Sequence, residues 1–233
     1  MIVEVQSHTL HERTAVTAIE SLTLEVPDVT VAGAFYKAAF DLGDLLALRT
    51  SDAPTTGFRA CTVSLVVSQP ATVDGFVEAA LDAGASALKP AKKSFWGYGG
   101  VVLAADGTIW KVATSSKKNT GPATREIDEI VLLLGVTDVA VSKRFYAERG
   151  LKVAKSFGRK YVQFDTGDVT LALYARSALA KDAGVSPEGT GSHRIVIGGD
   201  AGSFTDPDGF AWEPASGVER TTFAATTSPP AAA

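Results

Sequence analysis

The pattern of apolar and polar positions predicts a strand as the first clear element of the chain. Residues 19–26 read IESLTLEV, and this alternation is typical of a strand that is buried on one face. Side chains two positions apart share a face, so Ser21 and Thr23 are expected together on the polar face. Asp28 then predicts the N-cap of a helix over residues 29–40, whose apolar positions form one stripe.

The same periodicities predict the remaining elements. Further helices are expected over residues 72–83, from Asp138 to Gly150, and over residues 177–183. Strands are expected over residues 44–50, 59–67, 101–104, 108–113, 129–136, 151–157, 160–165, 169–174 and 193–197. The polar stretch with glycine and proline that follows residue 114 predicts a linker between two halves.

Two sequence motifs each occur twice. Residues 26–36 read VPDVTVAGAFY and residues 136–146 read VTDVAVSKRFY, while residues 105–111 read ADGTIWK and residues 205–213 read TDPDGFAWE. An Asp-Gly pair predicts a turn, because glycine readily adopts the positive φ that such turns require. The chain therefore contains an internal duplication, in which each copy runs from a strand through a helix to a strand that follows an Asp-Gly turn.

Each copy contains a first strand, then Asp and Phe-Tyr on a helix, and then a final Asp-Gly-x-x-Trp strand. This module resembles the glyoxalase/bleomycin resistance protein/dioxygenase superfamily, also called the vicinal oxygen chelate superfamily. The resemblance covers residues 17–216. It implies an α+β fold in which two tandem βαβββ modules form one curved, cupped mixed sheet with helices outside. Lyases, dioxygenases, isomerases, resistance enzymes and drug-binding proteins share this scaffold, so the fold alone does not give the activity.

The duplication and the resemblance together give a domain organisation. A first module is expected over residues 17–115, a linker over 116–126, a second module over 127–216 and a disordered tail over 217–233. Residues 1–17, which contain His8 and His11, are expected to be a solvated leader.

The resemblance also implies where a metal would bind. In such enzymes a divalent ion is held by His, Gln or Glu from the first and last strand of each module. Seven residues before each helix-starting aspartate stand Ser21 and Val131, and four residues after each Asp-Gly glycine stand Lys111 and Glu213. A catalytic ion needs about three nitrogen or oxygen donors, and of these four residues Glu213 alone is a ligand type. We therefore predict no metal in the usual place and no cofactor.

Lys111 suggests what replaces the ion. A lysine ammonium would repel a cation, and we expect it to pair with Glu213 and, if the second module's first strand shifts by two residues, with Glu129. The alternative is that Lys111 extends to the rim and Glu213 is an unpaired carboxylate in the cup. Lys111 and Glu213 are also the candidate catalytic residues if the protein is an enzyme.

The loop over residues 89–100, KPAKKSFWGYGG, has an unusual composition. Its lysines and aromatic residues stand among glycines that allow close backbone approach, which suits a loop that contacts a ligand through Trp96 and Tyr98. The alternative is a hairpin whose aromatic side chains cover the core while its lysines stay in water.

Composition restricts the partners. The net charge of −4 with interspersed signs predicts no nucleic-acid partner, and no apolar run approaches the roughly 20 residues that span a membrane. The single cysteine, Cys61, stands in an apolar run and is expected to be buried. We also expect a cytoplasmic protein. The resemblance leaves a homodimer open.

Three functions follow as hypotheses. The first is a metal-free cup that binds a small molecule through Ser21, Thr23, Lys111, Glu213, Glu129 and the aromatic residues of the loop, for example to sequester a toxic compound or an antibiotic. The second is an enzyme of the lyase or dioxygenase type, with or without a divalent metal. The third is a protein-interaction module whose cup is filled by side chains.

Overall fold

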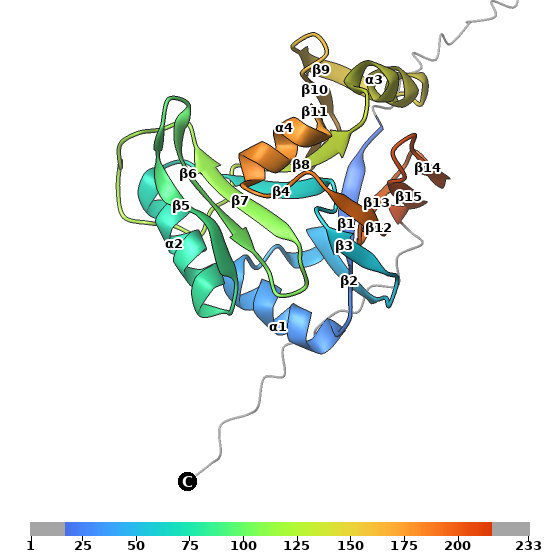
Figure 1. The fold of residues 1–233 in the computed structure, drawn as a ribbon. Coiled ribbons are helices and arrows are strands. Elements are labelled where there is room, and N and C mark those ends of the chain that lie inside the picture. Colours follow the sequence, from blue (N-terminus) through green and yellow to red (C-terminus); the bar gives the residue numbers. More distant parts are fainter. Residues whose placement is uncertain (1–16, 216–233) are drawn as a thin grey trace, which may run out of the picture.

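A computed structural model describes residues 17–215, and Figure 1 shows its fold. The expected leader with His8 and His11 and the expected tail over 217–233 lie outside the described residues, apart from Thr17. The described part contains the helices α1 (Val29–Ala39), α2 (Pro70–Asp82), α3 (Val139–Glu148) and α4 (Arg176–Ala183), with a short 3₁₀ helix η1 (Gly43–Leu45).

The strands follow the predicted order with several additions. They are β1 (Ile19–Val26), β2 (Leu46–Thr50), β3 (Thr55–Gly57), β4 (Cys61–Val66), β5 (Ser86–Ser94), β6 (Gly97–Leu103), β7 (Ile109–Thr114), β8 (Glu129–Val136), β9 (Lys152–Ser156), β10 (Tyr161–Asp165), β11 (Val169–Ala175), β12 (Gly189–Gly191), β13 (Ile195–Gly199), β14 (Phe204–Thr205) and β15 (Ala211–Pro214).

Most of the strands form an eight-stranded sheet in the order β5-β6-β7-β4-β8-β11-β10-β9. It consists of two four-stranded units with the same connectivity, β4-α2-β5-β6-β7 and β8-α3-β9-β10-β11. The first and last strand of each unit pair in parallel, and β4 joins β8 in an antiparallel pair. Each half of the chain therefore supplies one βαβββ unit to this sheet.

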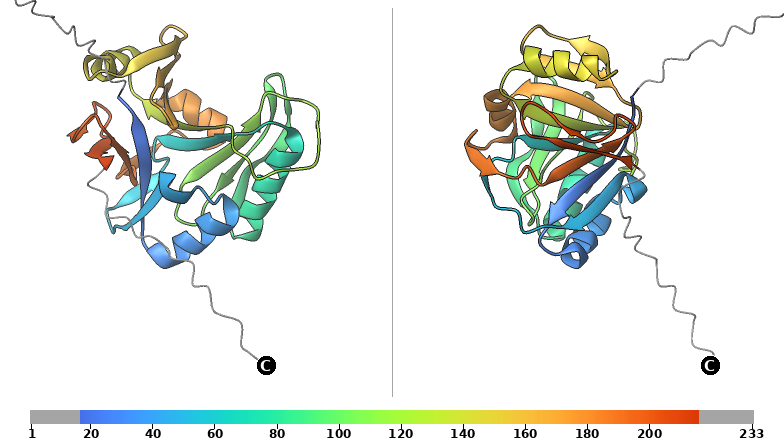
Figure 2. Two further views of the ribbon diagram at one scale, coloured as in Figure 1. Left: turned by 180° about the vertical axis from the view of Figure 1, so that it is seen from behind. Right: turned by 90° about the vertical axis from the view of Figure 1, so that its right-hand side faces the viewer.

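The ends of the described chain meet in a second sheet, with the order β14-β15-β13-β1-β2. Strand β1 forms a parallel pair with β2 and an antiparallel pair with β13. The first strand therefore lies beside strands from the end of the described chain (Figure 2). Strands β3 and β12 form a separate two-stranded ladder.

The predicted α+β class with curved sheets is confirmed, but the expectation of one sheet needs correction. Strand β1 has both edges occupied by β2 and β13, and β4 has both edges occupied by β7 and β8. Neither strand therefore has a free edge that could join the two ladders, and the strands divide between two main sheets. The module boundaries at residues 115 and 127 stay predictions.

Helices α1 and α3 are fixed by capping and by aromatic packing against these sheets. The carboxylates of Asp28 and Asp138 accept backbone N–H bonds in the first turn of each helix, as the sequence predicted. Tyr146 on α3 contacts Phe164 of the eight-stranded sheet and Trp212 of the five-stranded sheet, so α3 lies between the two. Phe40, the C-cap residue of α1, stacks on Trp110 with ring centroids 4.5 Å apart.

The two repeated motifs contact each other. The hydroxyl of Tyr36 on α1 donates to Asp106 at 2.6 Å, and the hydroxyl of Tyr146 on α3 donates to Asp206 at 2.7 Å. Burial, together with the neighbouring carboxylate, raises the pKa of both tyrosines well above the usual value. Each Phe-Tyr helix is thus tied to an Asp-Gly turn by a hydrogen bond that recurs in both halves.

Candidate functional site

Three residues that the sequence proposed for ligand binding lie on one face of the five-stranded sheet. Ser21 on β1 is paired with Gly198 on β13, which is paired with Glu213 on β15. Thr23 lies two positions further along β1 and shares the face of Ser21. The side chains of this face point away from the hydrophobic residues Leu22, Leu24 and Trp212, which belong to the core. We call Ser21, Thr23, Glu25, Arg49 and Glu213 the polar face.

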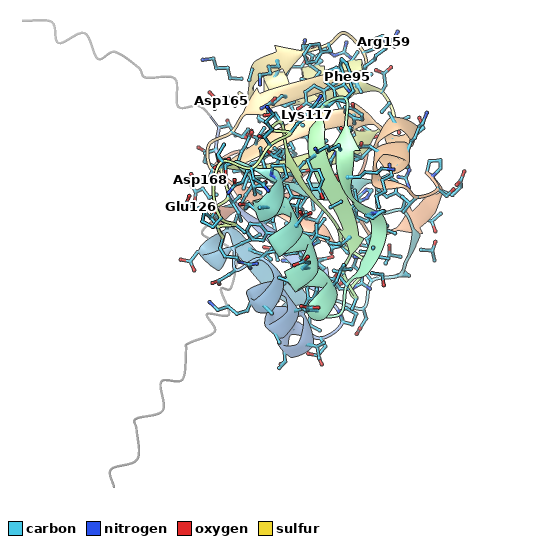
Figure 3. All side chains as sticks on the ribbon, turned by 90° about the vertical axis from the view of Figure 1, so that its left-hand side faces the viewer. Phe95, Lys117, Glu126, Arg159, Asp165 and Asp168 are labelled. Carbon is cyan, nitrogen blue, oxygen red and sulfur yellow. The ribbon has the colours of Figure 1, made fainter. Side chains whose placement is uncertain are left out.

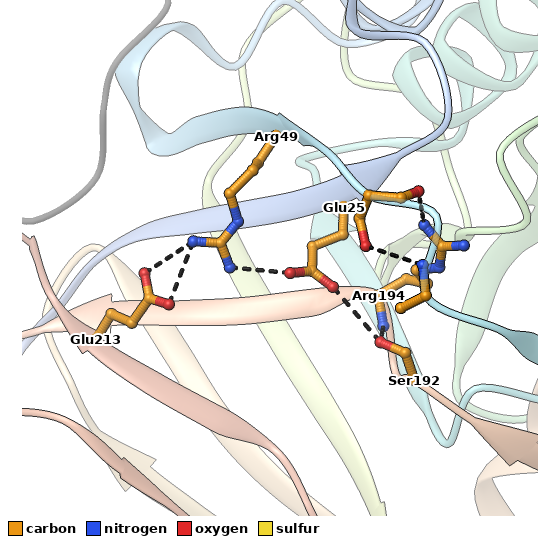
Figure 4. Close-up of polar contacts among 7 residues, drawn as sticks. Glu25, Arg49, Ser192, Arg194 and Glu213 are labelled. Carbon is orange, nitrogen blue, oxygen red and sulfur yellow. Dashed lines mark hydrogen bonds and ion pairs between the residues drawn. The ribbon is translucent and has the colours of Figure 1, made fainter.

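Arg49 is the cation of the polar face. It stands opposite Glu25 in the β1–β2 pair, and its Nη2 donates to Glu25 at 2.9 Å (Figure 4). Its Nη1 donates to both carboxylate oxygens of Glu213, at 3.2 and 3.1 Å. Burial lowers the pKa of Arg49, but the hydrogen bonds to Glu25 and Glu213 outweigh burial and raise the pKa above its usual value. One guanidinium therefore bridges two carboxylates across the face.

Two hydroxyl groups lie on the same face without hydrogen-bond partners. Ser21 and Thr23 are only 2% and 1% exposed. Within residues 17–215, neither Ser21 Oγ nor Thr23 Oγ1 has a donor or acceptor in reach. A buried hydroxyl that forms no hydrogen bond destabilises the fold, so each of these two groups keeps an unused donor and acceptor at a cost in stability.

The predicted ion pair between Lys111 and Glu213 is wrong. Lys111 lies on β7 of the eight-stranded sheet, whereas Glu213 lies on β15 of the five-stranded sheet. Lys111 Nζ instead donates to Asp182 on α4 at 2.7 Å. The four positions counted from the motifs thus separate into two pairs, because the strands that carry them belong to different sheets.

Helix α4 covers the face of the eight-stranded sheet to which Lys111 belongs. Lys111, Ser64 and Val131 stand side by side on adjacent strands of this sheet. A Cβ atom at Gly135, on the same side of β8 as Val131, would lie 3.2 Å from the Cα of Arg176, the first residue of α4. Lys89 Nζ donates to the carbonyl oxygens of Lys181 and Asp182 at the C-terminal end of α4, at 2.8 and 2.6 Å.

Glu129 also lies on this face of the eight-stranded sheet. It accepts a hydrogen bond from Thr170 at 2.6 Å and one from Gln163 at 3.5 Å. Its partners are therefore neutral side chains of β10 and β11, and Glu129 forms no ion pair with a described lysine or arginine. The expected pairing of Glu129 with Lys111 is wrong for this reason.

The two aromatic residues of the β5–β6 hairpin that were predicted to contact a ligand, Trp96 and Tyr98, lie away from both charged faces. Tyr98 donates to Asp74 on α2 at 2.7 Å, so its side chain lies on the helix side of the sheet. Trp96 is 83% exposed and contacts Phe95 at the hairpin tip, beside Lys117 (Figure 3). The alternation of side chains along β6 places Tyr98 opposite to Val101, which is the neighbour of Lys111. The prediction of Tyr98 in the cup is therefore corrected, and that of Trp96 as a ligand contact stays a prediction.

Arg49 is the residue that sequence reasoning missed. The expected strand over residues 44–50 contained it, but no sequence pattern indicated that this strand pairs with β1. The alternation of residues 46–50, LALRT, placed Arg49 on one side of a strand without identifying its neighbours.

The residues present do not fit a divalent metal ion. Within residues 17–215 no group of three or more His, Cys, Asp or Glu side chains is placed to hold one. On the polar face the two carboxylates are already bound to the guanidinium of Arg49. On the eight-stranded sheet the corresponding row contains Ser64, Lys111 and Val131, which supply no strong ligand set.

Comparison with solved structures identifies the fold. Glyoxalase I from Zea mays aligns with a TM-score of 0.55 and 14% identity, over 84% of this chain and 91% of the maize chain. A proposed dioxygenase from Bacillus subtilis aligns with a TM-score of 0.50 and 12% identity, over 82% of this chain and 71% of that chain. No protein-family model and no curated protein matches the sequence.

The chain therefore shares its fold with glyoxalase I, as its resemblance to the glyoxalase/bleomycin resistance protein/dioxygenase superfamily implied. At these identities the likeness establishes the fold and not the activity. No helix in the part of the chain that the structure describes is long and apolar enough to cross a membrane.

Proposed function

We propose that this protein binds a small molecule on the polar face of the five-stranded sheet through protein groups alone. The observation that carries the proposal is the bridge from Glu25 through Arg49 to Glu213, in which a guanidinium holds two carboxylates. Glu213 is the only one of the four motif positions with a metal-ligand side chain, and the guanidinium of Arg49 already neutralises its charge. A metal ion would therefore have to displace Arg49. Sequestration of a toxic compound or antibiotic is one use of such a site.

The chemistry of the polar face favours a ligand with hydrogen-bond donors. Two carboxylates and one guanidinium leave one negative charge, and all three side chains keep some contact with solvent. The hydroxyls of Ser21 and Thr23 add two short-range donor and acceptor groups beneath them. A small amine or amide would meet acceptors in Glu25 and Glu213 without needing a metal.

The other two hypotheses apply differently to the two sheets. On the eight-stranded sheet we favour the interaction module whose cup is filled by side chains. Helix α4 contacts that sheet, and Lys111 forms an ion pair with Asp182 of this helix. An enzyme that uses Glu213 as a general acid or base remains the alternative for the polar face, with Lys111 no longer its partner. Loss of turnover in Glu213→Gln with retained ligand binding would favour the enzyme.

A thermal-shift screen tests the proposal. A library of small amines and amides and the chlorides of manganese, nickel and zinc are added singly to the wild type, Glu213→Gln and Lys111→Met. We expect at least one organic compound to raise the melting temperature by mass action, with the shift lost in Glu213→Gln and kept in Lys111→Met. A stoichiometric transition metal in untreated protein, lost in Glu213→Gln, would contradict the proposal.

A further inference from the structure

A cavity of about 200 Å³ lies where the two sheets approach each other. It adjoins the polar face, because Ser192 hydrogen-bonds both Glu25 and the backbone N–H of Arg194, which lines the cavity (Figure 4). Its walls come from β1, the segment between β3 and β4, the turn between β6 and β7, the segment after α4 and the start of β13. Most of the lining is apolar and includes Leu24, Phe58, Leu103, Ile109, Val185 and Ile195. A cavity of this size and lining suits a molecule smaller than a typical drug.

Arg194 is the most enclosed charged residue of this lining. It is 8% exposed, and one of its terminal nitrogens donates to the carbonyl oxygen of Ser51 (Figure 4). Its Nε is buried and finds no acceptor within residues 17–215. No described carboxylate lies within ion-pair distance of Arg194. A buried guanidinium with a free N–H group favours an anion as its partner.

Arg59 adds a second positive charge to the same cavity. Its guanidinium donates to the carbonyl oxygen of Asp106, whereas the carboxylate of Asp106 is bound by the Tyr36 hydroxyl and the backbone N–H of Thr108. Burial lowers the pKa of Arg59, the nearby carboxylate of Asp106 partly offsets burial, and the positive charge of Arg194 makes a smaller lowering contribution. Two guanidiniums that repel each other are therefore held at one cavity.

The backbone at these arginines is also strained. Among the described residues, Asp41, Ala60 and Arg194 are the non-glycine residues with positive φ, and the values at Ala60 and Arg194 are 58° and 56°. Ala60 directly follows Arg59, so the positive φ occurs at Arg194 itself and next to Arg59. Such conformations cost free energy and concentrate at binding sites.

The remaining polar residues of the lining leave the cavity cationic. Glu188 contributes a carboxylate but is an exposed residue. His193 stacks on Phe210, and its two ring nitrogens face the carbonyl oxygens of Arg59 and Asp208 at 2.7 and 3.0 Å. The imidazole is therefore engaged by the backbone and offers no negative charge.

We propose that this cavity binds a small organic carboxylate, with its carboxylate group on Arg194 and Arg59 and its short apolar chain among Leu24, Phe58 and Ile109. A planar carboxylate matches the planar arrangement of guanidinium donors better than a neutral group does. The proposal does not depend on the function of the polar face, because the two sites share no residue.

Calorimetric titration with sodium butanoate tests the site, with butanamide as a ligand of the same shape and no charge. We expect saturable one-site binding of butanoate and no binding of butanamide. In Arg194→Met the affinity should fall at least about tenfold. In Arg144→Met, which removes an exposed arginine on α3 whose side chain is 72% exposed, the affinity should be unchanged.

Val185→Phe is the second variant, because it fills the cavity and keeps both arginines. It should abolish butanoate binding while the melting curve stays cooperative, and it decides the matter if Arg194→Met does not fold. Equal affinity for butanoate and butanamide, unchanged affinity in Arg194→Met or Val185→Phe, or no binding to the wild type would each overturn the proposal.

Discussion

Tyr36 in the first half of the chain and Tyr146 in the second half each donate a hydrogen bond to an aspartate, but the two aspartates differ in their position in the motif and in their surroundings. Asp206 is buried and also accepts the backbone N–H groups of Asp208 and Phe210, whereas Asp106 is partly exposed. The indole N–H of Trp212 reaches the Tyr146 hydroxyl at 3.3 Å. A tyrosine-to-aspartate contact between helix and turn therefore occurs in both halves, but Asp106 directly precedes its turn glycine, whereas Asp206 stands three residues before Gly209.

The faces of the two sheets diverged further. The eight-stranded sheet carries Lys111, whose partner Asp182 belongs to a helix that lies over the sheet. The five-stranded sheet carries Arg49, whose partners Glu25 and Glu213 belong to the sheet itself. The cation of the eight-stranded sheet is therefore paired with a helix that covers its face, whereas the cation of the five-stranded sheet is paired within the sheet.

Removal of the tyrosine hydroxyls should give the largest difference in the free energy of unfolding between variants of the two halves. Tyr146→Phe should lower the free energy of unfolding by about 2 kcal/mol, because buried Asp206 loses a donor that water cannot replace. Tyr36→Phe should cost about 1 kcal/mol, because Asp106 can take up water. Urea unfolding at neutral pH measures both, and a larger loss in Tyr36→Phe would contradict the comparison.

Replacement of the two cations should change the free energy of unfolding by amounts that differ less than those of the two tyrosine variants. Arg49→Met leaves Glu25 and Glu213 without their shared donor and should cost about 1 kcal/mol, since solvent screens these partly exposed groups. Lys111→Met breaks one exposed pair and should cost about 0.5 kcal/mol. The same unfolding experiment at low and high salt should show the loss shrinking with salt for both variants. Equal effects at low salt would argue against a special role for Arg49.

The smallest expected effect is a pH dependence from Asp206. Burial raises the pKa of this carboxyl above its usual value of about 3.9, and the bonds from Tyr146 and the backbone only partly offset burial. The folded state therefore binds a proton more tightly than the unfolded state, so this group contributes more stability as pH falls from the raised pKa towards the usual value.

Asp206→Asn isolates that contribution. The wild type should gain stability relative to Asp206→Asn as the pH falls through this window, and Asp106→Asn serves as the matched variant of the other half. Unfolding midpoints measured from neutral pH down to about pH 4 supply the comparison. A relative stability of the wild type that rises with pH would show that the pKa of Asp206 is not raised.

The local sequence pattern was sufficient to predict most helices and strands, but it was not sufficient to predict which residues of the candidate site contact each other. The Asp28 and Asp138 caps, the Phe-Tyr helices and the strands that follow the Asp-Gly turns all occur where the sequence placed them, because capping and periodicity depend on neighbouring residues. Neither the partner of Lys111 nor the side of the sheet on which Tyr98 lies could be obtained this way. Both depend on which strands pair and on where α4 lies.

The sequence by itself determined the internal duplication, the helix caps, the α+β class and the poverty of metal ligands at the motif positions. Tertiary structure decided that β1 pairs with β13 and β4 with β8, and this pairing placed Glu213 beside Arg49 and Lys111 beside Asp182. The physical reason is that backbone hydrogen bonds between strands are the same for most residues. Which strand lies next to which is therefore fixed by the packing of whole layers, and the chemistry of each face follows from that choice.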